Sequence, residues 1–290
     1  ASFMTHARAQ GWGVAVAAAS ERLAEHARPL GLSALCVGEE AVVDPSAFTL
    51  EGRPMRKLRQ SLSRARRHGW SFQVATTGEL AAGDLEQLAR LEHDWRRGQR
   101  RLQGFAMTLG RLGGAPEDQS MLHVLARSEH GRVGAVLRFA AYAGGYSLDA
   151  MRRSDDAPNG LTEALVCIAL QHVRELGVAE VSLNFAGFGH LMAPSRPLTR
   201  RERAAQAALR VAHARFQLER LSAFSDKFGP AWQPRYLLYE GRASLVRSGL
   251  RALQAEAYVR APRAPALERR WRPAAWPPPR GVPEWSPAPR

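Results

Sequence analysis

The order of strand-like and helix-like segments in the second half of the chain restricts its fold more than any other feature. Residues 121–127 and 132–141 are typical of a hairpin around the turn at 129–131, and further strands are predicted over residues 146–151, 180–185 and 235–239. Apolar residues spaced three and four apart predict helices over residues 160–176 and 200–219. The resulting order β-β-β-α-β-α-β is typical of an α+β fold, in which helices pack on a mixed sheet.

The first half of the chain has the same mixture of elements. We expect strands over 11–18, 34–44 and 70–76, with helices over 20–28, 52–68 and 80–96. A Gly- and Arg-rich connector separates the halves, so we predict an N-terminal lobe at 1–115 and a C-terminal lobe at 116–245. The remainder, 246–290, is predicted to be a flexible Pro/Arg-rich tail. Beyond about residue 260 prolines crowd in, and such a segment buries too little apolar surface to order itself.

Positive charge is concentrated in the predicted helix over 53–67. The chain has 41 Lys+Arg against 27 Asp+Glu, a net charge of +14, which favours a polyanionic partner, either nucleic acid or anionic lipid. Met55, Leu58, Leu62 and Ala65 form one apolar stripe on this helix, so the rest of its circumference is cationic. The predicted phosphate-binding residues are Arg53, Arg56, Lys57, Arg59, Arg64, Arg66 and Arg67. A solvated helix whose charge only aids solubility is the alternative.

The sequence lacks the motifs that are typical of several enzyme classes. The sequence has no Gly-x-Ser-x-Gly elbow, no P-loop, no His-Glu-x-x-His and no Cys-x-x-Cys, and its nine histidines show no metal-ligand spacing. We therefore predict neither a metal nor a resident cofactor. The two cysteines, Cys36 and Cys167, each lie in an apolar run and are expected to be reduced core residues.

One stretch carries residues suited to acyl transfer. Asp149 lies near the end of a predicted strand and Arg152 just past it, while Asn159 is a good helix cap with Glu163 one turn inside the helix. We expect the helix N-terminus to point its free N–H groups toward the place where Asp149 and Arg152 emerge. Acyl transfer needs such donors for an oxyanion and a carboxylate for a proton. An ordinary ion pair beside a capped helix explains the same residues.

A second stretch, residues 226–236, is dense in proline and aromatic residues. It contains Lys227, one of only two lysines in the chain, followed by Arg235 and Tyr236. Such a loop holds side chains rigidly, which suits a cation placed against a carbonyl or a phosphate. Packing of a closing strand also explains the aromatic residues.

Together these stretches, over about residues 11–239, resemble the C-terminal catalytic domain of the phosphatidylglycerol lysyltransferase (multiple peptide resistance factor) family. The resemblance rests on the segments 37–44, 48–53 with the basic helix that follows, 104–105, 147–152, 157–160, 182–185, 227–228, 232 and 234–236. Both lysines and both asparagines of the chain, Asn159 and Asn184, fall within or beside these segments.

The resemblance implies two acetyltransferase-like (GNAT-like) lobes and an enzyme that uses aminoacyl-tRNA as co-substrate. A lysyl or similar group would move to the glycerol hydroxyl of phosphatidylglycerol, altering membrane surface charge and resistance to cationic peptides. By position, the catalytic residues would be Asp149, Arg152, Glu163 and Lys227. The substrate-binding residues would be Asn159, Asn184, Arg235 and Tyr236, and the basic helix would bind tRNA.

The same resemblance implies action at the cytoplasmic face of a bacterial membrane, with a preceding transmembrane flippase domain that this chain lacks. Three alternatives remain open. The first is a soluble aminoacyl-tRNA-dependent transferase acting on a small metabolite or peptide. The second is an acyl-CoA N-acyltransferase, although the turn at 153–158 is acidic and glycine-free and would repel a pyrophosphate. The third is a non-catalytic tRNA-binding module.

Overall fold

The computed structural model describes residues 2–98, 112, 119–187 and 222–255. Its strands are β1 (Ala15–Ser20), β2 (Leu32–Val43), β3 (Ser71–Thr76), β4 (Leu122–Arg127), β5 (Val133–Tyr142), β6 (Gly145–Arg153), β7 (Glu180–Gly187) and β8 (Ala231–Glu240). Its α-helices are α1 (Ser2–Ala9), α2 (Glu21–Ala27), α3 (Arg56–Arg67), α4 (Ala82–Gly98), α6 (Leu161–Glu175) and α10 (Gly241–Ala255). The short 3₁₀ helices are η1 (Arg28–Leu30), η2 (Thr77–Glu79) and η4 (Asp226–Phe228).

The described strands form one mixed sheet in the order β1-β8-β2-β7-β6-β5-β4-β3. Only β6 and β7 run parallel, and the other neighbouring pairs in this sheet are antiparallel. Parallel neighbours require a crossover connection, which α6 supplies. The predicted α+β class, with helices flanking a mixed sheet, is confirmed.

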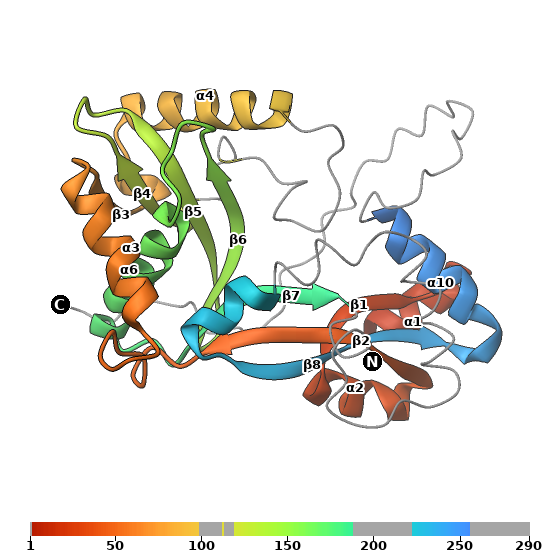
Figure 1. The fold of residues 1–290 in the computed structure, drawn as a ribbon. Helices are drawn as coiled ribbons and strands as arrows, with labels where there is room; N and C mark the ends of the chain where they lie inside the picture. The colour runs from red at the N-terminus through yellow and green to blue at the C-terminus, as the bar shows by residue number, and fades with distance from the viewer. Residues whose placement is uncertain (1, 99–111, 113–118, 188–221, 256–290) are drawn as a thin grey trace. The chain divides into compact units, whose positions relative to one another are not determined.

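Helices cover both faces of the β3–β7 part of the sheet (Figure 1). On one face α6 packs beside α3, and its buried residues, among them Leu161, Leu165 and Leu170, form a core with the strands. On the other face α4 contributes Leu88 and Leu91 to a separate core with β4, β5 and β6. We call these the α3/α6 face and the α4 face.

A β-bulge in β6 decides which of its residues reach each face. Arg138 of β5 pairs with Ala150, whereas the next residue, Phe139, pairs with Leu148, so Asp149 is the extra residue. Leu148 packs in the α3/α6 core, but Ala150 packs in the α4 core. The bulge therefore reverses the alternation of side chains along β6.

Strand pairing crosses the predicted lobe boundary at residue 115. β3, from the predicted N-terminal lobe, pairs with β4, while β8, from the predicted C-terminal lobe, lies between β1 and β2. Elements from both segments thus build both ends of one sheet, and the division into lobes stays a prediction.

The C-terminal part of the described chain is more ordered than the sequence predicts. Residues 246–255, placed in the flexible tail, instead belong to α10, which packs on β8 and β2. The expected helix over 200–219 and most of the connector at 98–114 lie outside the described residues. By internal contacts the chain divides into residues 1–259 and 260–290, and the second unit is likewise not described.

Candidate functional site

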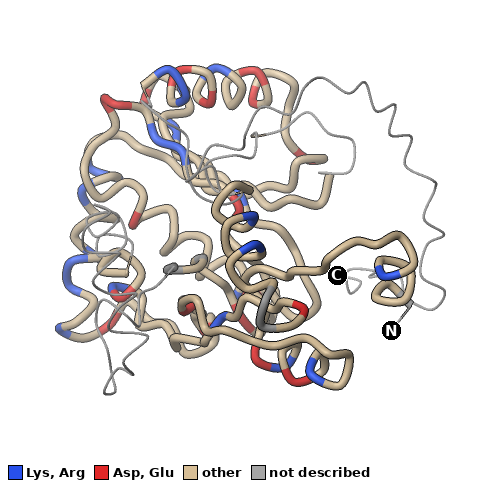
Figure 2. Tube along the Cα trace, turned by 90° about the vertical axis from the view of Figure 1, so that its right-hand side faces the viewer, with Lys and Arg blue, Asp and Glu red and all other residues tan. Residues whose placement is uncertain are grey.

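The basic helix forms as predicted, with its apolar stripe inward. Leu58, Leu62 and Ala65 of α3 are buried and Met55 is half-buried, which follows from their spacing. All seven predicted phosphate-binding residues are exposed. No ion pair joins any of them to an acidic residue within the described part of the chain. On α4, at the top of Figure 2, positive and negative residues are intermingled instead.

One cation of this helix region has a local structural role. Arg59 donates hydrogen bonds from Nη1 to the carbonyl oxygens of Leu50 and Gly52, the second at 2.7 Å. It therefore ties the loop before α3 to the helix. Arg53 precedes the helix, and the remaining five cations lie within α3.

A pocket of about 240 Å³ lies between α3, the start of α6 and η4. Its walls combine cations with polar groups and one carboxylate. The lining residues are Lys57, Leu58, Gln60, Ser61, Arg64, Asn159, Gly160, Glu163 and Lys227. The structure thus brings together two of the predicted catalytic residues, one predicted substrate-binding residue and the basic helix.

Inside this pocket Lys227 and Glu163 form an ion pair. Lys227 Nζ donates to Glu163 Oε1 at 2.7 Å, and the ammonium also lies 5.4 Å from the centroid of the Phe224 ring. The side chain of Glu163 is 18% exposed and that of Lys227 39% exposed. Residues 64 positions apart in the chain therefore meet in the fold and remain accessible from the pocket.

The start of α6 differs from the sequence prediction. Gly160, not Asn159, is the N-cap residue, with φ of 90° and no side-chain cap. A Cβ atom at Gly160 would lie 2.7 Å from Ser61 Oγ of α3, so glycine allows the two helices to approach closely. Asn159 is exposed and lines the pocket instead of capping the helix.

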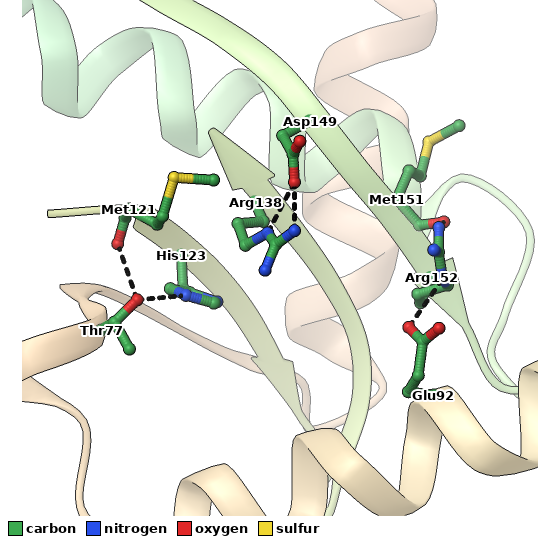
Figure 3. Close-up of polar contacts among 8 residues, drawn as sticks. All are labelled: Thr77, Glu92, Met121, His123, Arg138, Asp149, Met151 and Arg152. Atoms are coloured by element: carbon green, nitrogen blue, oxygen red, sulfur yellow. Dashed lines mark hydrogen bonds and ion pairs between the residues drawn. The ribbon is translucent and has the colours of Figure 1, made fainter. Parts of the chain in front are cut away.

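Asp149 lies on the α4 face, away from the pocket. Its carboxylate accepts a hydrogen bond from Arg138 Nε at 2.7 Å, and Arg138 Nη2 also contacts it (Figure 3). The Asp149 side chain is 18% exposed, whereas that of Arg138 is only 5% exposed. The carboxylate is therefore held by a buried cation and still reaches solvent.

Arg152 lies on the same α4 face but is fully enclosed. Its Nε donates to Glu92 Oε2 of α4 at 2.9 Å, and its guanidinium lies 4.0 Å from the centroid of the Trp95 ring (Figure 3). The Arg152 side chain is 0% exposed. Burial lowers the pKa of Arg152, and the Glu92 carboxylate acts against that shift.

The expected meeting of Asp149, Arg152 and the start of the helix is therefore wrong. β6 extends through Arg153, so both residues lie inside the strand, and the bulge at Asp149 directs them to the α4 face. Glu163 and Lys227 lie on the α3/α6 side. The four predicted catalytic residues thus form two groups, and their roles stay predictions.

A buried histidine lies next to the Arg138–Asp149 pair on the α4 face. His123 of β4 lies directly opposite Arg138 of β5 and is 1% exposed. Its Nε2 lies 2.9 Å from Thr77 Oγ1. Burial, with the nearby Arg138 charge, lowers the pKa of His123 to about 4, so the ring is neutral at neutral pH.

Sequence reasoning missed Glu92, Trp95, Arg138 and His123, although the chain contained signals for two of them. Glu92 falls among the apolar positions of α4, four residues after Leu88, and a carboxylate there requires a buried cation. His123 interrupts a strand whose next three residues are apolar and buried. A polar residue in such a strand must find a polar partner.

The predicted substrate-binding residues of β8 contact other elements. Arg235 forms an ion pair with Glu40 of β2, and burial lowers its pKa. The Tyr236 hydroxyl lies 3.5 Å from Glu21 Oε1, and burial raises the pKa of Tyr236. Asn184 lies on β7, but its side chain is outside the described part of the structure.

β6 and β7 pair over three positions only, Gly145–Ser147 with Glu180–Ser182. Beyond these positions β6 stays paired with β5, and β7 stays paired with β2. The two strands diverge in Figure 1, and Asp149 lies two residues past the last pair. The pairing of β6 with β7 thus ends two residues before Asp149.

A family model described as the C-terminal domain of phosphatidylglycerol lysyltransferase matches residues 1–239. The chain belongs to this family. The predicted family membership is confirmed, and the family is described as one of transferases.

Among the similar proteins is the lysylphosphatidylglycerol biosynthesis bifunctional protein LysX of Mycobacterium tuberculosis, which is 36% identical over 256 residues. The alignment covers 86% of this chain and 21% of LysX, so the chain spans about a fifth of that protein's length.

Two solved structures of the family share the fold. L-PGS from Bacillus licheniformis superposes with a TM-score of 0.70 at 25% identity, covering 89% of this chain and 77% of the other. The C-terminal domain of a putative lysylphosphatidylglycerol synthetase from Agrobacterium fabrum gives a TM-score of 0.69 at 28% identity, covering 90% and 78%.

Within the described residues, no helix is both long and apolar enough to cross a bilayer. The same residues contain no cluster of three or more His, Cys, Asp or Glu placed to hold a metal ion.

Proposed function

We propose that this domain transfers an aminoacyl group, lysyl or similar, from aminoacyl-tRNA to the glycerol hydroxyl of phosphatidylglycerol. In this reaction the glycerol hydroxyl oxygen loses its proton and attacks the ester carbonyl, the bond between that carbonyl and the tRNA ribose oxygen breaks, and the ribose oxygen takes up one proton, so that no net proton is gained or lost. The family membership and the names of the similar proteins support the lipid product. A lysyl ester adds two ammonium groups to an anionic headgroup, which reverses its charge and would weaken binding of cationic peptides.

The observation that carries the tRNA part of the proposal is the continuity of α3 with the pocket. Seven exposed cations without acidic partners in the described residues present a surface suited to a phosphate backbone. Two of them, Lys57 and Arg64, also line the pocket that holds the Glu163–Lys227 pair. A tRNA acceptor end lying along α3 would thus lead toward these residues.

The separation of the predicted catalytic residues suggests a division of labour. Lys227 and Glu163 are suited to bind the tRNA end on the α3/α6 side, because they combine a cation and a carboxylate in an open pocket. Asp149 is suited to bind the ammonium group of the aminoacyl moiety, since its carboxylate is partly exposed on the other side. This division of labour requires the acyl group to pass between β6 and β7, which pair over three positions only.

The turn before α6 weighs against the acyl-CoA alternative. Asp155 and Asp156 are exposed there, and Asp156 is paired with Arg132. Two carboxylates at this position disfavour a pyrophosphate. Phosphatidylglycerol is a bilayer lipid, so the proposal places the domain at a membrane surface, and the cytoplasmic location and a preceding membrane domain remain expectations.

The test is a transfer assay with the purified chain. Aminoacyl-tRNAs carrying a radiolabelled amino acid are mixed with phosphatidylglycerol vesicles, and the lipid is extracted and counted. We expect label in the lipid, with none from phosphatidylcholine vesicles. Label in a water-soluble acceptor, or no transfer from any aminoacyl-tRNA, would contradict the lipid proposal.

Salt dependence tests the role of α3 separately. Substituting Lys57, Arg64 and Arg67 by Gln should weaken tRNA binding and reduce the slope of log affinity against log salt by about two to three. The matched control replaces three exposed arginines elsewhere, Arg22, Arg28 and Arg90, and removes the same charge. Equal losses in both variants would mean that net charge alone, rather than α3, attracts tRNA.

A further inference from the structure

Four polar residues form a row across three strands and the neighbouring η2 turn on the α4 face. Thr77 of η2 contacts His123 of β4, His123 lies opposite Arg138 of β5, and Arg138 holds Asp149 of β6. Figure 3 shows the imidazole between the Thr77 hydroxyl and the Arg138 side chain, with Asp149 beyond Arg138. The row therefore runs from the edge of the sheet to the part of β6 that lies past its pairing with β7.

The contacts of Thr77 fit the His123 tautomer that carries its proton on Nε2. In that tautomer the Thr77 hydroxyl donates to the carbonyl oxygen of Met121, which can only accept and lies 3.4 Å from Oγ1. Thr77 Oγ1 then accepts from His123 Nε2–H at 2.9 Å. Nδ1 is left with its lone pair, and no described residue donates to it.

This arrangement suits a ring next to a buried guanidinium. A lone pair on Nδ1 is attracted by the Arg138 cation, whereas a second proton on the ring, at Nδ1, would place two positive charges on directly opposed residues. Arg138 contacts the Asp149 carboxylate through both Nε and Nη2. A neutral His123 therefore adds no positive charge beside the Arg138–Asp149 pair.

We propose that His123 is a positioning residue: anchored on Thr77, its ring holds Arg138 on Asp149 and so aims the Asp149 carboxylate at the ammonium group of the aminoacyl substrate. The inference rests on the proposed function, because Asp149 needs a cationic group to bind. It adds a residue that acts through Arg138 and does not itself touch the substrate, since His123 is 1% exposed.

The experiment compares His123→Leu, His123→Gln and Thr77→Val with His130→Gln, an exposed histidine in the β4–β5 turn. We expect His123→Leu to lower kcat/KM for aminoacyl-tRNA on the order of ten- to a hundredfold, because small displacements at a reacting centre have effects of this size. Affinity for uncharged tRNA and KM for phosphatidylglycerol should stay unchanged. His123→Gln, which keeps a donor toward Thr77, should restore part of the loss, and Thr77→Val should reproduce part of it.

A second substrate distinguishes a specific effect on the position of the Asp149 carboxylate from a general loss of activity. With aminoacyl-tRNA acetylated on every amino group of the aminoacyl moiety (both the α- and ε-amino groups of lysyl), no ammonium group remains, and wild type and His123→Leu should react at similar, reduced rates. Equal fold losses of His123→Leu on both substrates would overturn the proposal. The proposal would also be overturned if His123→Leu lowered the stability of the fold but, when folded, kept kcat/KM within about twofold of the wild-type value.

Nitrogen NMR of the wild-type histidines gives a readout that does not depend on transfer. We expect a neutral His123 with the proton on Nε2 at neutral pH, and a proton on Nδ1 would overturn the proposal. Absence of transfer by wild type with every aminoacyl-tRNA would instead refute the proposed function, so the two failures are distinguishable.

Discussion

Removing the carboxylate that faces Arg152 should strongly destabilise the fold. The Arg152 side chain is 0% exposed and that of Glu92 is 9% exposed, so Glu92→Gln removes the charge of a carboxylate that is bonded to a buried guanidinium. Glu92 also pairs with Arg96, so the same substitution weakens a second contact. Breaking a buried ion pair on one side costs about 3–5 kcal/mol. Because Gln keeps one hydrogen-bond acceptor, we expect the lower end of that range.

Equilibrium unfolding in urea, followed by circular dichroism, measures this loss. The matched control is Glu86→Gln on the same helix, where the Arg90–Glu86 pair spans 3.4 Å with both side chains well exposed. It should change the free energy of unfolding by no more than about 0.5 kcal/mol.

A double substitution tests whether the buried charge of Arg152 causes the expected loss of stability. Replacing Glu92 by Leu and Arg152 by Met removes both charges, so it should be less destabilising than Glu92→Gln alone. A Glu92→Gln protein within about 0.5 kcal/mol of wild type would show that other groups compensate the Arg152 charge. The electrostatic account of this face would then be wrong.

Three further outcomes follow from the structure. Gly160→Ala should lower the free energy of unfolding by about 1–3 kcal/mol, because φ of Gly160 is 90° and a Cβ atom would clash with Ser61. Thermal or urea unfolding measures this loss, and an unchanged stability would contradict the close approach of α3 and α6. Burial raises the pKa of Cys167 to about 12, so a thiol reagent should label half-buried Cys36 in the folded chain and Cys167 only in denaturant. Burial lowers the pKa of His123 to about 4 from 6.5, so the unfolded chain binds the extra proton between these values. Stability should therefore fall on the order of 3 kcal/mol as pH drops from about 6.5 to about 4, and the fall should be smaller in the His123→Leu variant.

Features with a local cause could be predicted from the sequence. The apolar stripe of α3 predicted both the helix and its cationic exposed surface, and these are confirmed. The order of strands and helices predicted a mixed sheet with flanking helices, which is confirmed. The patterns behind that prediction are properties of residues that are neighbours in the chain. The start of α6 and residues 246–255 escaped prediction: Gly160 is required by contact with Ser61, and α10 is supported by packing on β8 and β2.

The face on which each functional side chain lies was decided only in three dimensions. One extra residue, Asp149, reverses the alternation of β6, so Asp149 and Arg152 lie away from Glu163 and Lys227. Buried charges take partners from distant elements, as Arg152 does with Glu92, 60 residues away in the chain. Sequence periodicity describes neighbours within one element, whereas bulges and buried ion pairs depend on which elements the whole chain packs together.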